Sequence, residues 1–340
     1  METTLNYALT YITKVSGQSV SASRIVILAD NDYYSQSSTS DYSHGRFAKF
    51  GVTLKEANKT GLGSSAALVT SLTAALLSHY LSQEQFDLTS VPGKRTLHNL
   101  AQAAHCAAQG KVGSGFDVAA AVYGSCTYRR FSPSVLGQIP EAGQPGFGEK
   151  LISVVDREEW DVAVDGDGLT MPSGVTLRMC DVDCGSQTVG MVKKVLAWRG
   201  QDAEGSKKLW DDLQARNEAL GVALQHGEVA KLPEKVGDVR ELIRKMGHLS
   251  DVPIEPETQT ELLDAVSQVD GVYGGVVPGA GGFDALALLV KDDEATKQRV
   301  DEFLARWSQE KGSKVKLLQV KGEMEGVRKE ASDLYLSWLS

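Results

Sequence analysis

The sequence is poor in several features that would assign a 340-residue chain to a class at once. Lys and Arg number 35 against 44 Asp and Glu, so a net charge of −9 offers no footprint for nucleic acid or an anionic membrane. No uncharged apolar run is long enough to span a bilayer, and the first residues lack the basic and apolar pattern of a secretory leader. We therefore expect a cytoplasmic protein that binds neither nucleic acid nor membrane.

Cysteine is also scarce. Cys180 and Cys184 have no second Cys or His pair downstream, which argues against a zinc site, so we expect all four cysteines to be reduced thiols. There is no internal repeat, and no obligate protein partner is evident. The length and a hydrophobic content of 42% favour two domains, which we predict at 1–172 and 173–340.

The most informative stretch is Lys-Thr-Gly-Leu-Gly-Ser-Ser-Ala-Ala-Leu-Val at 59–69. Gly61 and Gly63 allow positive φ and a close approach of the backbone to a ligand. The apolar residues that follow have helical spacing, so the loop ends on a helix N-terminus, whose free N–H groups and partial positive charge suit a phosphate. Ser64 and Ser65 either cap this helix or face a Mg²⁺-bound phosphate.

A second glycine-rich stretch, 109–125, brings Asp117 to the start of another helix. Its carboxylate is either catalytic or Mg²⁺-orienting, or it only complements the helix dipole. Lys111, Arg129 and Arg130 either neutralise phosphate or form a solvated basic patch.

A third glycine-rich stretch, 274–290, either makes a structural turn into a strand or packs against a nucleotide site from the second domain. Ser186 and Thr188 stand at a helix start as caps or as substrate contacts. His98 and His105 share a helix face, and without a third ligand we interpret them as packing or surface residues.

Hydrophobic periodicity predicts the secondary structure. Pro92-Gly93 is interpreted as a break between two helices. The expected helices are 2–16, 64–81, 96–109, 188–199, 204–225, 236–247, 257–269 and 325–339. The expected strands are 24–30, 151–155, 160–164, 175–181, 285–290 and 314–320.

In this order, Lys-Thr-Gly-Leu-Gly-Ser-Ser-Ala at 59–66, Gly-Lys-Val-Gly-Ser-Gly-Phe-Asp at 110–117 and Gly-Ser-Gln-Thr at 185–188 resemble the GHMP kinases, and in detail the fungal phosphomevalonate kinases. The resemblance implies an α+β two-domain fold with a ribosomal-S5-like first domain and a ferredoxin-like second domain. Family members begin with a strand and a Pro-Gly-Lys motif ahead of the phosphate loop. Here Pro92-Gly93-Lys94 lies after that loop, so we expect the first domain to be incomplete at its start.

The same resemblance implies transfer of the ATP γ-phosphate to 5-phosphomevalonate, with ATP and Mg²⁺ as cofactors. It implies catalytic roles for Asp117 and Lys111 and metal contacts from Ser64 and Ser65. The implied nucleotide-binding residues are Lys59, Thr60, Gly61, Leu62, Gly63, Ser64, Ser65, Ala66 and Ala67. The implied substrate-binding residues are Ser114, Arg129, Arg130, Ser186, Thr188 and Gly281. Two alternatives stay open: a nucleotide-binding relative with little catalysis, and a GHMP kinase for another small molecule such as mevalonate.

Overall fold

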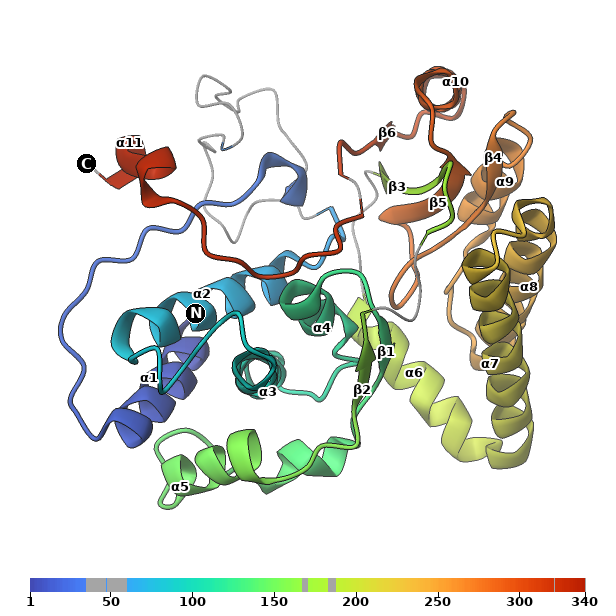
Figure 1. The fold of residues 1–340 in the computed structure, drawn as a ribbon. Helices are drawn as coiled ribbons and strands as arrows, with labels where there is room; N and C mark the ends of the chain where they lie inside the picture. The colour runs from blue at the N-terminus through green and yellow to red at the C-terminus, as the bar shows by residue number, and fades with distance from the viewer. Residues whose placement is uncertain (35–46, 48–59, 167–170, 183–187, 321, 340) are drawn as a thin grey trace. The chain divides into compact units, whose positions relative to one another are not determined.

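The computed structural model describes residues 1–34, 47, 60–166, 171–182, 188–320 and 322–339. Two compact units divide the chain (Figure 1). The first comprises Met1–Leu28, Gly63–Leu169 and Glu323–Ser340. The second comprises Ala29–Leu62 and Thr170–Gly322. Both units are therefore built from segments that are far apart in the sequence.

The first unit is mainly helical, and α1, α2 and α3 pack on one another around its core. Leu77, Leu97 and Leu100 are fully buried there. The helices are α1 (Glu2–Ser16), α2 (Ser64–Tyr80), α3 (Val91–Gln109), α4 (Phe116–Tyr123), α5 (Phe147–Ile152) and α11 (Leu336–Leu339), with short helical turns η2 (Pro133–Gln138), η3 (Ser153–Arg157) and η5 (Ser332–Tyr335). Strands β1 (Thr127–Arg129) and β2 (Ala163–Asp165) form a small antiparallel sheet.

The second unit contains a four-stranded antiparallel sheet in the order β4-β5-β3-β6. Its strands are β3 (Val175–Val182), β4 (Val272–Val276), β5 (Ala285–Lys291) and β6 (Val315–Leu317). Its helices are α6 (Thr188–Gln201), α7 (Ala203–Gln225), α8 (Leu232–Ser250), α9 (Glu257–Val266) and α10 (Glu294–Lys311), with helical turns η1 (Asn31–Tyr33) and η4 (Val229–Lys231).

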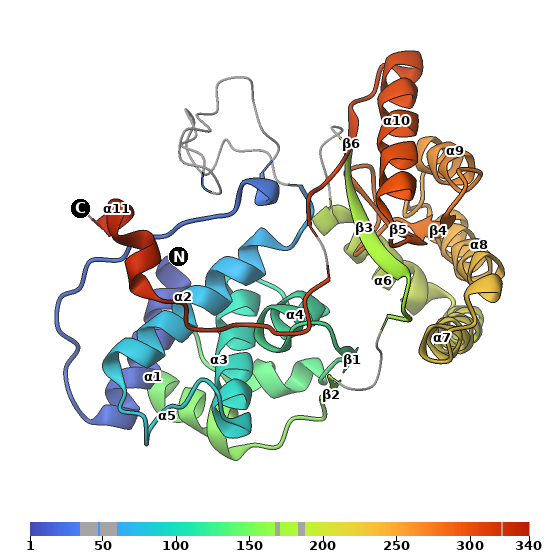
Figure 2. The same ribbon diagram turned by 45° about the horizontal axis from the view of Figure 1, so that its top comes forward.

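Alternation along β5 explains how this sheet is covered. Leu286, Leu288 and Val290 are two residues apart, so their side chains share one face of the sheet. They belong to one buried cluster with residues of α9 and α10, such as Leu263 and Leu304, and Figure 2 shows both helices on the same side of the strands. This packing gives the second unit its main core.

Several predicted elements are confirmed. The residues that mark where each of them begins and ends lie close together in the sequence. Helix α1 ends at Gly17, whose φ of 67° places it in the left-handed region that favours glycine. Helix α2 and strand β3 begin and end within one residue of their predicted bounds. The expected break at Pro92-Gly93 is wrong: both residues lie in the first turn of α3, where proline is tolerated and the Ser90 hydroxyl accepts a hydrogen bond from the Gly93 N–H.

Three other predicted elements are also wrong. The expected strand 24–30 forms neither strand nor helix, and Ile25 and Ile27 are exposed. The expected strand 151–155 is helical, spanning the end of α5 and η3. The expected helix 325–339 is reduced to η5 and α11 at its end. Short apolar runs suit strand and helix equally, and the available partners decide between them.

Candidate functional site

The first glycine-rich stretch leads directly into α2. Gly61 and Gly63 have φ of 73° and 71°, as expected. Gly63 itself is the N-cap of α2, and no side chain caps the helix, so the first of the two alternatives for Ser64 and Ser65, a helix cap, is wrong. Ser64 and Ser65 are instead the first two helical residues, beside backbone N–H groups that have no partner within the helix. Lys59 lies outside the described residues.

Thr60 and Gly61 make their contacts within the second unit. The buried Thr60 donates its N–H to the Tyr33 carbonyl (3.3 Å) and its hydroxyl to the Asp32 carbonyl (2.6 Å). A Cβ on Gly61 would lie 3.3 Å from the Cβ of Ala285 and 3.7 Å from Oδ2 of Asp284. The backbone at Gly61 therefore passes close to the end of the third glycine-rich stretch.

Gly63 and Asp117 are neighbours within the first unit. A Cβ on Gly63 would lie 3.6 Å from the Cβ of Asp117. Asp117 is half-buried in the first turn of α4, and its Oδ1 accepts a hydrogen bond from the Val118 N–H (2.9 Å). Helices α2 and α4 thus begin beside one another, so two positive helix ends lie next to a single carboxylate.

Three side chains hold the loop between α3 and α4 by its carbonyl groups. Gln102 Nε2 donates to the Gly115 carbonyl (2.6 Å), and Tyr128 Oη donates to the Ser114 carbonyl (3.2 Å). Arg130 Nη2 donates to the Val112 carbonyl (3.0 Å). The loop therefore has a defined path, with the Ser114 side chain exposed.

The pKa of the Cys106 thiol is influenced by three of the predicted charged residues. Burial raises this pKa; the Gly113 N–H lowers it, Asp117 raises it, and Arg130 and Lys111 lower it. The charges of Asp117, Lys111 and Arg130 thus all act on one buried thiol beside the second glycine-rich stretch.

Arg129 is not part of this group. It is exposed on β1, and its charge acts on Asp161. The pKa of Asp161 is lowered mainly by the Ser132 hydroxyl and N–H, with a small contribution from Arg129. The two adjacent arginines therefore interact with different parts of the first unit.

His105 is the functional candidate that the sequence analysis missed. It is 5% exposed, and its Nε2 lies 3.2 Å from Ser65 Oγ at the start of α2. Its position near the end of a helix that enters a glycine-rich loop was the available signal. His98 does match its interpretation as a packing residue: it is buried beside the rings of Tyr123 and Trp160, and burial lowers its pKa to about 4.

The third glycine-rich stretch is held by the backbone and one side chain of the second unit. The Gly282 N–H donates to the Ile254 carbonyl (2.9 Å), and Gln259 Nε2 donates to the Phe283 carbonyl (2.5 Å). Gly281 has φ of 83° and is packed so tightly that a Cβ would overlap the Ile254 carbonyl oxygen. Of the other predicted substrate residues, Thr188 begins α6 and Ser186 lies outside the described residues.

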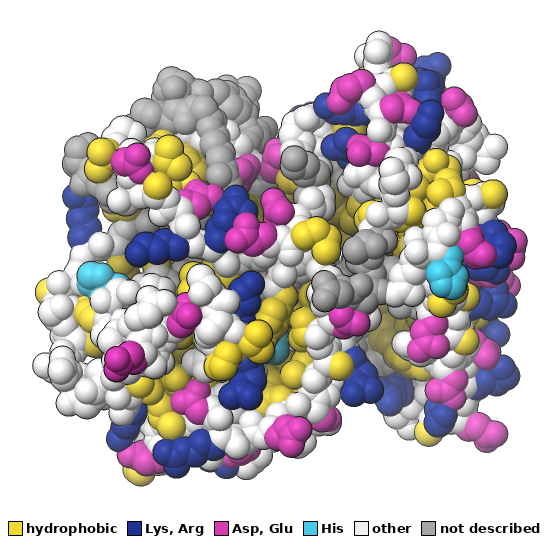
Figure 3. Space-filling view, in the orientation of Figure 1, with side chains coloured by type: hydrophobic (Ala, Val, Ile, Leu, Met, Phe, Trp, Pro, Cys, Tyr) yellow, Lys and Arg dark blue, Asp and Glu magenta, His cyan; other side chains and the backbone are white. Residues whose placement is uncertain are grey.

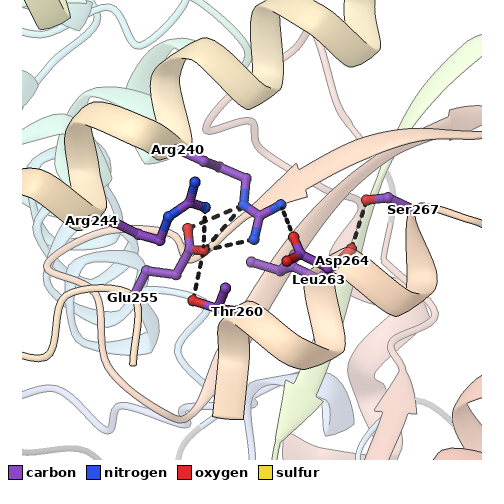
Figure 4. Close-up of polar contacts among 7 residues, drawn as sticks. All are labelled: Arg240, Arg244, Glu255, Thr260, Leu263, Asp264 and Ser267. Atoms are coloured by element: carbon purple, nitrogen blue, oxygen red, sulfur yellow. Dashed lines mark hydrogen bonds and ion pairs between the residues drawn. The ribbon is translucent and has the colours of Figure 1, made fainter. Parts of the chain in front are cut away.

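A buried ion network anchors the segment that holds this turn (Figure 4). Glu255 follows Ile254, and its side chain is 1% exposed. Its Oε1 accepts from Arg240 Nη2 (2.7 Å) and Arg244 Nη1 (3.1 Å), and from the Thr260 hydroxyl (3.0 Å). Arg240 also reaches Asp264 on α9 through Nη1 (2.7 Å). The network joins α8, the segment before α9, and α9 itself.

Two family profiles match the chain. The GHMP kinases N terminal domain matches residues 44–125, and the GHMP kinases C terminal domain matches residues 223–312. This chain belongs to the GHMP kinases. The predicted family, the predicted α+β fold class and the predicted enzyme class, an ATP-dependent kinase, are therefore confirmed.

Within the GHMP kinases, the chain is similar to proteins named phosphomevalonate kinase. Phosphomevalonate kinase ERG8 of Gibberella zeae is 68% identical over an alignment that covers 100% of this chain and 78% of the relative. Phosphomevalonate kinase erg8 of Aspergillus fumigatus is 48% identical, with 100% of this chain and 75% of the relative covered. A crystal structure of a Listeria innocua protein matches with a TM-score of 0.68 at 18% identity, covering 94% of this chain and 79% of that one, and supports the fold alone.

Proposed function

We propose that this GHMP kinase transfers the γ-phosphate of ATP to 5-phosphomevalonate, giving 5-diphosphomevalonate and ADP in the mevalonate route to isoprenoids and sterols. The observation that carries the proposal is the 68% identity to a phosphomevalonate kinase over the whole chain.

The nucleotide phosphates are assigned to the loop of residues 59–67. Its two left-handed glycines allow the backbone to approach a ligand, and the start of α2 offers free N–H groups at a positive helix end. The neighbouring start of α4 adds a second positive helix end next to Gly63. Both features suit a polyphosphate.

The oxygen donors at this loop fit Mg²⁺. Ser64, Ser65 and Asp117 supply hydroxyl and carboxylate oxygens, which Mg²⁺ prefers, and in the described part of the chain no group of three or more His, Cys, Asp or Glu could hold a metal ion by itself. Mg²⁺ commonly binds through one or two protein oxygens together with phosphates and water. When bound, it would neutralise the charge of the β- and γ-phosphates. Asp117 would orient the metal or the Lys111 ammonium group.

The acceptor does not require a strong general base. A phosphate monoester has a second pKa of about 6 and is mostly dianionic at pH 7. The task of the protein is to bring two polyanions together in line, which requires cations and N–H donors. We assign Lys111 and Arg130 to this role first, because the charges of both act on Cys106 and Arg130 donates to the Val112 carbonyl in the loop before Asp117. Ser114, Arg129, Ser186, Thr188 and Gly281 remain assigned to the acceptor.

The charge distribution agrees with a small-molecule substrate. On the face drawn in Figure 3, Lys and Arg side chains are interspersed with Asp and Glu among the described residues. None of the described helices is both long enough and apolar enough to cross a membrane. A cytoplasmic location remains a proposal, which fluorescence microscopy of the tagged chain would check.

Turnover by the purified chain tests the proposal. ADP release is measured with Mg-ATP and, in parallel, 5-phosphomevalonate, mevalonate or homoserine. We expect turnover with 5-phosphomevalonate and little with the other two. ATP binding without turnover on any acceptor would indicate a nucleotide-binding relative with little catalysis. Turnover on mevalonate alone would indicate a GHMP kinase for mevalonate. Either result would overturn the assignment.

Replacement of Asp117 tests its role within this reaction. Asp117→Asn keeps the shape of the side chain but removes the charge, so we expect kcat to fall roughly 10²–10³-fold, because a transition-state contact is lost. Nucleotide affinity should change much less. Glu149→Gln is the control, because Glu149 is exposed and pairs with Lys14, and neither residue is assigned a role in the reaction. Equal losses in both variants would argue against a catalytic Asp117.

A further inference from the structure

His105 and Ser65 form a hydrogen bond between the two helices that flank the phosphate loop. Ser65 is the second residue of α2, and His105 lies four residues before the end of α3, 40 residues later. Ser65 Oγ and His105 Nε2 are 3.2 Å apart, and His105 is 5% exposed. The imidazole is therefore held in place by packing, whereas a serine hydroxyl on a helix otherwise has several rotamers available.

Gln109 determines which group donates in this hydrogen bond. Gln109 Nε2 lies 2.9 Å from the same Nε2 of His105. An amide nitrogen donates and does not accept, so His105 Nε2 is the acceptor and the imidazole proton is on Nδ1. The Ser65 hydroxyl consequently also donates to His105 Nε2, at the longer distance of 3.2 Å, and shares the single lone pair of this nitrogen with Gln109. Both lone pairs of Ser65 Oγ stay available for a cation or for another donor.

Cys106, the residue after His105, connects the C-terminal part of α3 to the second glycine-rich stretch. The Cys106 carbonyl accepts from the N–H groups of Gly110 and Lys111, the latter at 3.2 Å, and the Gly113 N–H is directed at the Cys106 thiol. The C-terminal part of α3 thus contacts one glycine-rich stretch through His105 and the other through Cys106, so it can fix the spacing of the two loops.

We propose that His105 is a positioning residue for the nucleotide: it directs the Ser65 hydroxyl so that the oxygen is presented to the Mg²⁺-bound phosphates of ATP. This inference rests on one part of the proposed function, the binding of Mg-ATP. It does not depend on the identity of the acceptor. His105 itself touches no substrate in this scheme. Its effect therefore passes through Ser65.

Calorimetric titration with Mg-ATP, without any acceptor, is the primary test. His105→Ala should weaken Mg-ATP binding about tenfold, the value of one well-placed hydrogen bond. A glutamine amide reaches the position of the imidazole Nε2, whereas an asparagine amide reaches only that of Nδ1. His105→Gln should therefore retain most of the affinity, and His105→Asn should lose it. Binding of ATP without Mg²⁺ should differ much less among these variants.

A double-mutant cycle separates positioning from a general structural role. If His105 acts through Ser65, then His105→Ala should cause no further loss in a Ser65→Ala background. Thr73→Ala is the control: Thr73 is fully buried on α2 and its hydroxyl has no hydrogen-bond partner among the described residues, so its removal should leave Mg-ATP affinity unchanged. Additive losses, or equal losses for His105→Gln and His105→Asn, would overturn the proposal. Failure of turnover on 5-phosphomevalonate would not affect these binding results, so the two proposals fail separately.

Discussion

The Arg240 guanidinium contacts both carboxylate oxygens of Glu255 in the second unit, with Nη2 2.7 Å from Oε1 and Nε 3.2 Å from each oxygen. Glu255 follows Ile254, whose carbonyl accepts the hydrogen bond from Gly282. A buried charge pair therefore stabilises the backbone that holds the third glycine-rich stretch. A pair of this kind costs much to break, because the remaining charge stays buried without its partner.

Removal of Arg240 should be strongly destabilising. Arg240→Met leaves the Glu255 carboxylate with Arg244 as its remaining cation, so we expect the free energy of unfolding to fall by about 3 kcal/mol. Urea denaturation followed by tryptophan fluorescence measures this change. Lys207→Met, which removes an exposed ion pair with Asp211, should cost less than about 1 kcal/mol. Similar costs for the two variants would contradict the role given to the buried pair.

Gly115 should not tolerate a side chain. Its φ is 80°, and a Cβ would lie 2.7 Å from both Gln102 Nε2 and Tyr128 Oη, the groups that hold the loop before α4. We expect Gly115→Ala to lower stability by roughly 2–3 kcal/mol through backbone strain and displaced hydrogen bonds.

Gly113→Ala is the matched control in the same loop, because a Cβ there meets nothing within 4 Å. Thermal unfolding and turnover are compared for both variants. If Gly113→Ala proved the more harmful of the two, the assigned path of this loop would be wrong.

Buried His98 should make stability depend on pH. Its pKa is about 4 in the folded protein against an ordinary value of 6.5, so between these values the unfolded chain binds a proton that the folded chain does not. Stability is therefore fully present above pH 6.5 and is lost as the pH falls towards 4, by about 3 kcal/mol in all.

His98→Gln removes this titration, so the stability of the variant should fall less than that of the parent chain between pH 7 and pH 4.5. Fluorescence of Trp160, 6.0 Å from the His98 ring between centroids, follows the unfolding. Exposed His79 provides the comparison: His79→Gln should keep the full pH dependence. An unchanged pH profile for His98→Gln would remove His98 as its source.

The segment after Gly322 returns to the first unit and contacts the end of α4. The Ser125 N–H donates to the Glu323 carbonyl (2.8 Å), and the Val327 N–H donates to the Val122 carbonyl (3.3 Å). A Cβ on Gly326 would overlap the Val122 carbonyl. The end of helix α4 that lies away from Asp117 is thus held by residues 323–327.

Gly326→Ala should therefore destabilise the first unit by roughly 1–3 kcal/mol and speed hydrogen exchange in α4. Gly137→Ala, where a Cβ meets no atom within 4 Å, should do neither. Exchange rates in α4 that are the same in both variants would show that the closing segment does not hold this helix.

Much of the fold could be predicted because its signals are local. The helical spacing from Glu2 to Ser16 ends at a glycine, and the apolar run from Val175 is bounded by a turn. Residues 24–30 have an equally strong strand pattern but lie outside any described sheet. A strand needs a partner for its backbone groups, and a single run of residues carries no information about that partner.

The sequence alone was sufficient for the family, for the left-handed glycines at 61 and 63, and for Asp117 at a helix start, because each depends on a few adjacent residues. Only the folded chain decided that His105 reaches Ser65, that Arg129 and Arg130 separate, and that residues 323–340 join the first unit. Two of these results concern contacts between residues that are far apart in the sequence, and the third concerns the directions of two adjacent side chains. All three depend on how whole helices and strands pack, which no short stretch of sequence specifies.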